Sequence, residues 1–369
     1  MQIKNLYLKN FRNYSEQNFE FINGLNILTG SNAQGKTNCA EAVYFLCTGY
    51  SPRAGKDKEI ILYGQQKSII EGKAQTSYGE TDVEIEILAD GKKDIKINGV
   101  KVVKVGELLG NINSVFFNPS ELKIVQESPE DRRRFMDLAL SQMSKSYYYS
   151  LLRYKKILAQ RNNLLKYPNQ QDIIDTLPIW DEHLSVYGGA IIKSRTEFLQ
   201  SLKPYAKEAH AYLTDNLEDL EIDSEVKYSG NIVEGLLNDL KKSYAKDMKL
   251  GFTTVGPHRD DMKIHINGKD VKTYGSQGQK RTAALSIKLA ETEFFKNRTG
   301  EYPILILDDV LSELDNKRKK KLLEKIKNIQ VILTCTEKER ILSKVSFREI
   351  KIDNGKIKAI KDKILKTEN

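Results

Sequence analysis

Apolar and polar residues alternate in the first hundred residues of the chain in the way that the strands of a half-buried sheet require. Residues 3–11 and 19–21 predict a short strand pair, because their apolar side chains recur at every second or third position. Residues 25–29 predict a further strand that leads into a glycine-rich turn, and residues 36–47 carry apolar side chains at helical spacing. Residues 83–97 contain two alternating segments around an Asp-Gly turn, which predicts an antiparallel hairpin.

A different pattern begins near Pro129. From residue 140 to residue 165, apolar side chains recur at alternating steps of three and four, and Arg161 is the one break. The same spacing returns over residues 180–212, after a polar stretch at residues 167–176. Two helices joined by so short a loop run antiparallel, so we predict a helical hairpin with a coiled-coil-like seam.

Two apolar runs near the end of the chain predict buried strands. Residues 304–307 are Ile-Leu-Ile-Leu and end in Asp308 and Asp309, as a central parallel strand buried on both faces would. Residues 330–333 predict a neighbouring strand. Both ends of the chain therefore contribute strands to one α/β sheet.

Length and composition agree with a main domain and a smaller one. The chain has 369 residues, and 40% of them are apolar, which is enough to bury a sizeable core. We predict that residues 1–125 and 251–369 form an α/β core. Residues 126–250 are predicted to form a helical domain inserted into it.

The chain carries 59 Lys and Arg against 50 Asp and Glu, a formal net charge of +9, so its surface field attracts polyanions such as nucleic acid. A soluble enzyme without a nucleic-acid role could carry the same charge. Residues 130–166 hold nine Lys or Arg and three acids, with Tyr147, Tyr148 and Tyr149 among them, which favours contact with phosphates. Alternatively, these helices simply carry charges outside the seam and tyrosines on it. We interpret the basic run at residues 317–321 as a solvated helix face.

Cysteine usage and the N-terminus indicate a reducing, intracellular location. Cys39, Cys47 and Cys335 are too few and too far apart for a disulfide framework or a CxxC metal site, and the two helix cysteines are expected to be buried. Residues 1–10 lack the apolar core of a signal peptide, and no apolar run reaches membrane-spanning length. We therefore expect a cytoplasmic protein without a membrane partner.

The segment between the strand at residues 25–29 and the helix at residues 36–47 matches GxxxxGK[ST], in the strand–turn–helix context that this motif requires. Its glycines let backbone N–H groups approach phosphate oxygens, and the helix N-terminus adds partial positive charge. Lys36 is predicted to neutralise the β- and γ-phosphates of ATP, and the Thr37 hydroxyl to ligate Mg²⁺. A chance glycine turn that caps a helix is the alternative. The predicted nucleotide-binding residues are Gly30, Ser31, Asn32, Ala33, Gln34, Gly35, Lys36, Thr37 and Asn38.

Two adjacent carboxylates close the predicted strand at residues 304–307. Burying unpaired charge costs free energy, so Asp308 and Asp309 need a partner, and Mg²⁺ supplies one. Asp308 is predicted to hold the metal through water. Asp309 and Lys36 are predicted catalytic residues, with Asp309 polarising the attacking water. A charged strand end in solvent is the alternative interpretation.

A second anion site is predicted where Ser276, Gln277, Gly278 and Gln279 begin a strong helix, because Ser276 is a good N-cap residue and the first N–H groups of a helix are free to bind anions. This segment lies 32 residues before Asp308 and resembles the signature loop of ATP-binding-cassette (ABC) ATPases, and residues 312–315 resemble their D-loop. In that superfamily the signature loop reaches the γ-phosphate bound by the partner subunit. The resemblance therefore implies an ATP-dependent homodimer, in which Ser276 acts as a catalytic residue across the interface.

Three further segments resemble the RecF family. Residues 9–14 look like its N-terminal FRNY segment, residues 129–137 resemble its P-x-x-R-R-x-F-hydrophobic-D stretch, and residues 256–261 are similar to its GPHRDD segment. The insert between Thr37 and Ser276 is longer than in transporter ATPases and far shorter than in SMC or Rad50 proteins. The resemblance spans the whole chain and implies an ABC-type, SMC/Rad50-like P-loop ATPase head with an inserted helical arm domain.

The resemblance also implies a role in recombinational DNA repair and replication restart. A RecF-like protein is expected to bind ATP with Mg²⁺, to bind DNA at gaps or at junctions between single and double strands, and to act with RecR and RecO in loading RecA. The alternatives are an SMC- or Rad50-like ATPase that tethers DNA, and a nucleotide-gated protein scaffold without a direct DNA role. A transporter subunit agrees least with the residues at the predicted site.

Some residues depart from these patterns. Ser120 and Glu127 stand where the RecF family often has an acid and a glycine. Asp309 replaces the glutamate of ABC transporters, and residues 334–336 occupy the place of their switch histidine. A shorter carboxylate without the histidine positions water less well, so we expect weak, DNA-stimulated ATP hydrolysis that acts as a conformational timer.

Two further residues have competing interpretations. Resemblance to SMC-type ATPases places Arg12 near the P-loop, in contact with phosphate, whereas the alternative is an ordinary surface arginine. His258 has no His, Cys or carboxylate cluster at ligand spacing around it, so we expect a structural role for it rather than a metal site.

Overall fold

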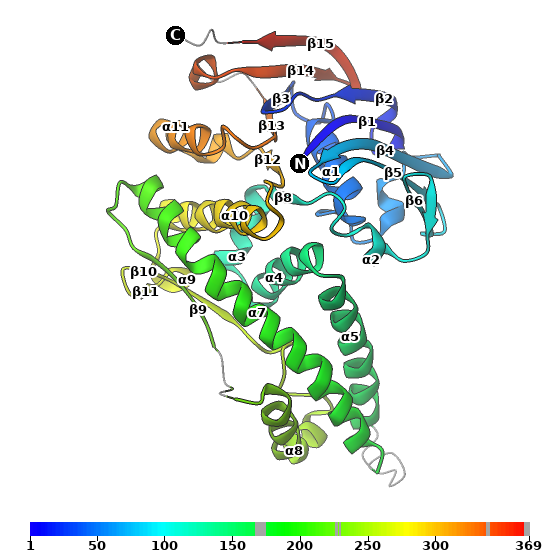
Figure 1. The fold of residues 1–369 in the computed structure, drawn as a ribbon, viewed down its shortest axis with the longest axis vertical. Helices are drawn as coiled ribbons and strands as arrows, with labels where there is room; N and C mark the ends of the chain where they lie inside the picture. Colours follow the sequence, from blue (N-terminus) through cyan, green and yellow to red (C-terminus); the bar gives the residue numbers. More distant parts are fainter. Residues whose placement is uncertain (167–174, 226–227, 229, 337–339, 365–369) are drawn as a thin grey trace. The chain divides into compact units, whose positions relative to one another are not determined.

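The computed structural model describes residues 1–166, 175–225, 228, 230–336 and 340–364 (Figure 1). The chain forms two compact units, each built from separate segments of sequence. The first unit comprises Met1–Leu122, Glu208–Glu218 and Arg281–Asn369, and the second comprises Lys123–Lys207 and Asp219–Lys280. In the described part of the chain, no helix combines the length and the apolar character needed to cross a bilayer.

The first unit is organised around a six-stranded sheet that both ends of the chain complete, as the sequence predicted. All neighbouring strands pair in parallel except β14 and β15. Every residue of β3, β12 and β13 is buried, which explains why these strands are mostly apolar. In sheet order, the strands are β15 (Lys356–Lys363), β14 (Phe347–Asp353), β3 (Leu25–Thr29), β13 (Val331–Cys335), β12 (Ile304–Asp308) and β8 (Ser114–Phe117).

A second six-stranded sheet in the same unit is antiparallel throughout. It includes the predicted N-terminal strand pair and the predicted hairpin at residues 83–97. Helix α1 (Lys36–Thr48) packs against strands of both sheets and is buried on almost all sides, including Cys39 and Cys47. Gly49 ends α1 in a left-handed conformation, with φ 72°. In sheet order, the strands are β2 (Tyr14–Glu20), β1 (Gln2–Phe11), β4 (Lys67–Thr76), β5 (Gly79–Leu88), β6 (Lys93–Ile97) and β7 (Val100–Val102).

Helices and short 3₁₀ turns complete the first unit. Most of α10 lies here, and its buried positions run almost without interruption from Thr282 to Phe295, so it is a central helix rather than an amphipathic surface helix. The elements are η1 (Asp57–Ile60), α2 (Val105–Leu108), η2 (Pro119–Leu122), α10 (Gln277–Thr299), η3 (Leu311–Glu313), α11 (Asn316–Lys325) and η4 (Arg340–Lys344).

The basic run on α11 is paired within the first unit. Lys317 and Lys321 contact the Asp215 carboxylate at 2.6 and 2.8 Å, and Arg318 contacts Asp315 at 2.7 Å. These contacts agree with our interpretation of the run as a helix face rather than an anion-binding site.

The second unit is mainly helical and adds a small antiparallel sheet of order β11-β10-β9 that the sequence did not predict. Its helix α8, which buries Leu236 and Leu240, was not predicted either. The elements are α3 (Lys123–Gln126), α4 (Pro129–Met143), α5 (Lys145–Leu165), most of α7 (Leu177–Thr214), β9 (Leu220–Ser224), α8 (Ile232–Leu250), β10 (Met262–Ile266), β11 (Lys269–Asp270) and α9 (Val271–Tyr274).

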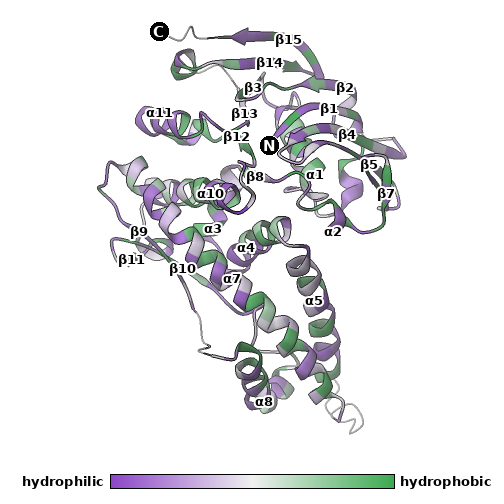
Figure 2. Cartoon of the chain, in the orientation of Figure 1, coloured by the Kyte–Doolittle hydropathy of each residue, from purple (hydrophilic) through white to green (hydrophobic). Residues whose placement is uncertain are grey.

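Helices α5 and α7 form the predicted antiparallel pair (Figure 1). Near the start of α5, Tyr147 accepts a hydrogen bond from Arg195 in the middle of α7, whereas near the end of α5, Arg161 contacts Asp181 at the start of α7. Hydrophobic and hydrophilic residues alternate around both helices in Figure 2, as expected for helices with one buried face. Most of the predicted loop at residues 167–176 lies outside the described residues.

The prediction of one continuous helix from residue 140 to residue 165 was wrong at Ser144. Helix α4 ends at Met143, and Ser144 adopts an extended backbone, with φ −146° and ψ 110°. Its hydroxyl accepts a hydrogen bond from the Tyr147 N–H group, so Ser144 is the N-cap of α5. The spacing of apolar residues stays even across Ser144, because α4 and α5 each bury one apolar face.

Arg161, the one break in the apolar pattern, is the largest fully buried side chain of the described residues. Its Nε donates to Asp181 at 2.6 Å, and its Nη1 donates to Asp247 at 2.7 Å and to Thr253 at 2.9 Å. Burial raises the pKa of Asp181, although the Arg161 guanidinium opposes that shift. This charge cluster therefore joins α5, α7 and α8.

Replacing Arg161 by methionine should destabilise the protein, because two buried carboxylates lose their cation. We expect Arg161→Met to lower the free energy of unfolding by about 3–5 kcal/mol in a urea titration at neutral pH. The loss of unfolding free energy should become smaller as the pH falls. The pKa of Asp181 is raised in the folded state, and the group is no longer a buried charge once it is protonated. Arg161→Lys keeps the charge and should lose less, and equal losses for the two variants at every pH would contradict this account.

Candidate nucleotide-binding site

The turn between β3 and α1 has a backbone shape that only small residues permit. Gly30, Ala33 and Gly35 have φ values of 147°, 64° and 120°. A Cβ atom at Gly30 would lie 2.3 Å from the Ile352 carbonyl oxygen, and one at Gly35 would lie 2.8 Å from the Tyr14 hydroxyl. No side chain caps the start of α1, so its first N–H groups remain free for an anion. The turn therefore has the features of a phosphate cradle.

The RecF-like segment at residues 9–14 braces this turn. Asn13 donates from its side-chain amide to the Gln34 carbonyl at 3.0 Å, and the Tyr14 hydroxyl donates to the Gly35 carbonyl at 2.9 Å. Asn38, on the first turn of α1, donates to the Asn13 side chain at 2.8 Å. Our sequence reasoning used this segment as a family marker and missed its contacts with the P-loop.

Lys36 folds back over the turn that precedes it. Its Nζ donates to the carbonyl oxygens of Gly30 and Ser31 at 2.6 and 2.7 Å, and burial lowers its pKa. These two backbone carbonyl groups therefore hold the Lys36 ammonium group beside the pocket. The residues that line this pocket are Asn32, Ala33, Gly35, Lys36, Thr37, Asn38, Arg53, Asp309, Thr334 and Thr336.

Thr37 and Asp308 are brought together from opposite ends of the chain. The Thr37 hydroxyl donates to Asp308 Oδ1 at 2.8 Å, and the Thr334 hydroxyl donates to the same oxygen at 2.7 Å. Burial raises the pKa of Asp308, and the two hydroxyl groups oppose that shift. Hydroxyl and carboxylate oxygens are the ligands that Mg²⁺ prefers, so this pair fits the metal of a P-loop. In the described chain, no group of three or more His, Cys, Asp or Glu could hold a metal ion, so a metal at Thr37 and Asp308 would take its remaining ligands from phosphate and water.

Thr334 also positions Asp309. The backbone N–H of Asp309 donates to the Thr334 hydroxyl at 3.0 Å, and Asp309 adopts a left-handed conformation with φ 56°. A non-glycine residue in this region is strained by about 1 kcal/mol or more, and such strain concentrates at functional sites. Thr334 is the first residue of the segment 334–336, which was expected from the resemblance to occupy the place of the ABC transporters' switch histidine, and its hydroxyl orders both members of the acidic pair.

Two arginines lie beside the P-loop helix. Sequence reasoning named Arg12, whose guanidinium donates to the Glu41 carboxylate and to the Glu59 carbonyl oxygen. It missed Arg53, which lines the pocket and donates to Asn38 Oδ1 at 2.6 Å. Arg53 follows α1 in an irregular loop, so no periodicity or motif marks it in the sequence.

The segment that begins α10 has the predicted N-cap. The Ser276 hydroxyl accepts a hydrogen bond from the Gln279 N–H group at 3.2 Å, and the Gln279 side chain accepts one from the Ser276 N–H group at 2.9 Å. This reciprocal capping box holds residues 276–279 at the helix N-terminus. In the D-loop-like segment, the Ser312 hydroxyl donates to the Asp309 carbonyl at 2.8 Å, so it is tied directly to the acidic pair.

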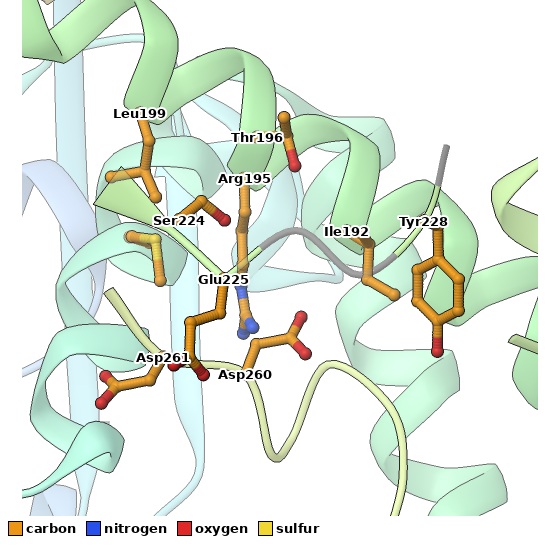
Figure 3. A pocket seen from close by; sticks show the side chains of 10 residues that line it. Ile192, Arg195, Thr196, Leu199, Ser224, Glu225, Tyr228, Asp260 and Asp261 are labelled. Atoms are coloured by element: carbon orange, nitrogen blue, oxygen red, sulfur yellow. The ribbon is translucent and has the colours of Figure 1, made fainter. Parts of the chain in front are cut away.

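Two RecF-like motifs of the second unit contact each other. Arg132, from the first motif, forms a bidentate ion pair with Asp261 of the second, at 2.6 and 2.8 Å. His258 lies between Tyr154 and the Thr253 carbonyl, and burial lowers its pKa to about 4. These contacts agree with the structural role expected for His258. Figure 3 shows the neighbouring pocket, whose lining includes Arg195, Glu225, Tyr228, Asp260 and Asp261.

The structure corrects part of the DNA-contact prediction for residues 130–166. Arg132, Arg133 and Arg161 bind acceptors inside the second unit, and Tyr147 and Tyr148 are buried, so these five side chains are not free to contact DNA. The remaining cations are exposed and have no ion-pair partner among the described residues. They are Arg134, Lys145, Arg153, Lys155, Lys156 and Lys166.

Comparison with known proteins agrees with this geometry. Residues 2–358 match the family model of the RecF/RecN/SMC N terminal domain. The chain is similar to the DNA replication and repair protein RecF of Alkaliphilus oremlandii (strain OhILAs), at 44% identity over 348 residues, which cover 92% of this chain and 95% of the relative. It is also similar to a solved structure of the recombination mediator protein RecF-ATP in the RecFOR pathway, with a TM-score of 0.88, 39% identity and coverage of 98% of this chain and 97% of that chain.

An SmcHead structure, bound to the C-winged helix domain of ScpA, shares the fold at a TM-score of 0.60 and 16% identity, covering 99% of this chain and 98% of that chain. Together with the family match, this likeness confirms the predicted fold class, an ABC-type, SMC/Rad50-like ATPase head with an inserted helical domain.

Removing the Thr334 hydroxyl should destabilise the acidic pair. Thr334→Val keeps the side-chain shape but leaves buried Asp308 with one hydrogen bond fewer and the Asp309 N–H group without its acceptor. We expect the free energy of unfolding to fall by about 1–3 kcal/mol. Thr334→Ser retains the hydroxyl and should stay close to wild type. Equal stability of the Thr334→Val variant and the wild-type protein in thermal unfolding would contradict the role given to this hydroxyl.

Proposed function

This chain belongs to the RecF family of ABC-type ATPases, and we propose that it binds ATP with Mg²⁺, dimerises on the nucleotide and binds DNA as a recombination mediator. The observation that carries this proposal is the contact between Thr37 and Asp308 beside the glycine turn. A hydroxyl from the P-loop helix and a carboxylate from the end of a buried strand meet at 2.8 Å, and a phosphate-bound Mg²⁺ requires that pair.

The roles of the site residues follow from their chemistry. The backbone N–H groups of residues 30–38 would bind phosphate oxygens, and Lys36 would leave the Gly30 and Ser31 carbonyls to neutralise the β- and γ-phosphates. Thr37 and Asp308 would hold Mg²⁺, which supplies charge neutralisation of the phosphates when it is bound. Asp309 would polarise the attacking water.

Slow hydrolysis follows from the surroundings of Asp309. Its carboxylate is one methylene shorter than the glutamate of transporter ATPases, and its backbone is fixed by Thr334. The Thr334 hydroxyl already donates to Asp308, so it has no proton left to donate to water or phosphate. A poorly positioned water lowers the rate steeply, which suits a timer better than a motor.

Dimerisation is proposed to use the capped start of α10. Ser276, Gln277, Gly278 and Gln279 are held at a helix N-terminus, and in ABC ATPases the corresponding segment binds the γ-phosphate held by the partner subunit. ATP would then join two protomers, and hydrolysis would remove the γ-phosphate contact and let them separate.

Substitutions at the two phosphate-binding segments should separate nucleotide binding from dimerisation. Lys36→Met removes the cation of the P-loop and should abolish ATP binding. Ser276→Arg should leave ATP binding by the monomer intact and prevent ATP-driven dimers. Sedimentation with a slowly hydrolysed ATP analogue measures both effects, and ATP-driven dimers of the Ser276→Arg protein as tight as those of wild type would contradict the proposed dimer.

DNA is the proposed macromolecular partner. The net charge of +9 and the roles for which the relatives are named, in DNA replication, repair and recombination, support it. By family resemblance, the protein would bind at gaps or junctions between single and double strands in the cytoplasm. There it would act with RecR and RecO to promote RecA loading, and DNA would stimulate its weak ATPase activity.

The exposed cations of α5 and of its C-cap residue, Lys166, are the proposed phosphate contacts in the second unit. Lys145, Arg153, Lys155, Lys156 and Lys166 recur on the side of the helix that faces solvent. No carboxylate of the described residues pairs with them, so phosphates can neutralise them without first breaking an ion pair.

Reversing two of these charges should weaken DNA binding and its dependence on salt. For Lys155→Glu combined with Lys156→Glu, we expect the slope of the logarithm of the DNA-binding constant against the logarithm of the salt concentration to become shallower by about one to two. Each lost phosphate contact reduces the magnitude of that slope by about 0.9. The matched control, Lys92→Glu with Lys101→Glu, makes the same charge change on the first unit, where both lysines are exposed and already paired with carboxylates. An unchanged slope in the α5 variant, measured with gapped duplex, would exclude this face, and salt-independent binding by wild type would favour a scaffold without a DNA role.

A further inference from the structure

Glu41 is a fully buried carboxylate on the P-loop helix that holds two arginines. Its relative exposure is 0%. Arg12 donates to both of its oxygens, from Nη2 at 2.7 Å and from Nε at 3.0 Å, and Arg53 also donates to it. The Ser51 hydroxyl donates to Glu41 Oε1 at 2.5 Å. Burial by itself would raise the pKa of Glu41, but these donors more than offset it, so its pKa is lowered and the group is an anion.

The two guanidinium groups share one carboxylate beside a pocket built for phosphate. Arg53 lines that pocket and also donates to Asn38, which follows Thr37 on α1. Arg12 precedes Asn13, which bonds to the P-loop carbonyl of Gln34. Within this cluster one carboxylate serves two guanidinium groups, and guanidinium groups bind phosphate and carboxylate with the same bidentate geometry.

The backbone on both sides of this cluster is fixed. The Arg12 N–H group donates to the Ile60 carbonyl at 2.7 Å, and Arg12 itself has a left-handed φ of 53°. Ser51 accepts hydrogen bonds from the N–H groups of Arg53 and Ala54, at 3.0 and 2.7 Å, which orders the turn that carries Arg53. Movement of either guanidinium group therefore depends on side-chain torsions and on the strength of its bonds to Glu41.

We propose that Glu41 is the resting counter-ion of Arg12 and Arg53, and that it competes with the phosphates of ATP for these two cations. Glu41 is then a positioning residue that keeps the two arginines ordered beside the pocket before ATP binds. It also lowers the affinity for ATP, because the bonds from Arg12 and Arg53 to Glu41 must break before these arginines can bind phosphate. This inference rests on the proposed ATP-binding function and assigns a regulatory role within that site.

Neutralising Glu41 should strengthen ATP binding and lower the thermal stability of the nucleotide-free protein. For Glu41→Gln, we expect ATP affinity, measured by isothermal titration calorimetry, to rise roughly tenfold, because a charge-assisted competitor is lost. The thermal midpoint without nucleotide should fall, and the increase in midpoint on adding ATP should be larger than for wild type. A purely structural role predicts the opposite sign for affinity, since a damaged site binds more weakly.

Three matched variants make the test specific. Glu84→Gln removes one carboxylate of an exposed ion pair with Lys96 in the same unit and should leave ATP affinity unchanged. Glu41→Asp keeps the negative charge but moves it away from the arginines by one methylene. It should give an intermediate gain in ATP affinity even if Glu41→Gln folds poorly. In the Arg53→Ala background, Glu41→Gln should gain less than in wild type, because one of the released cations is missing.

Folded Glu41→Gln and Glu41→Asp proteins that bind ATP no more tightly than wild type would overturn the inference. The proposed ATP binding has a separate point of failure, because it fails if the wild-type chain does not bind ATP.

Discussion

The parallel pairing of β3, β13 and β12 is the constraint on which the candidate site depends. Parallel strands end at the same edge of a sheet, so the P-loop after β3, Thr334 near the end of β13 and Asp308 at the end of β12 are forced together. The hydrogen bonds from Thr37 and Thr334 to Asp308 form because these strand ends lie together. The mostly apolar sequences of these strands fit this position, because every one of their residues is buried.

Charge placement divides the cations of the protein into two groups. Arg12, Arg53, Arg132 and Arg161 bind carboxylates inside a unit. The lysines and Arg153 on α5 face solvent without partners among the described residues. Only the second group can take up phosphates without first losing a protein contact, whereas cations of the first group must exchange one anion for another. Net charge alone does not distinguish these groups.

Much of the fold was predictable because its signals are local. The mostly apolar strands β3, β12 and β13, the helical spacing of α1, and the GxxxxGK[ST] turn were all identified from neighbouring residues. The error at Ser144 arose because apolar spacing does not report a one-residue break when the flanking helices bury similar faces. The strands β9, β10 and β11 were missed because they are only two to five residues long and carry a weak periodic signal, whereas α8, with 19 residues and Leu236 and Leu240 buried on one face, was missed despite a clear helical pattern.

By itself, the sequence determined the P-loop, the acidic pair, the serine-capped start of α10 and the family to which these belong, since each depends on residues within one short segment. Only the tertiary structure decided which distant side chains meet: Thr334 with Asp308 and Asp309, Asn13 and Tyr14 with the P-loop, and Arg53 with Glu41. The reason is physical. Hydrogen bonds and ion pairs act over about 3 Å, and the spacing of two residues along the chain does not reveal whether strand pairing and loop paths bring them within that distance.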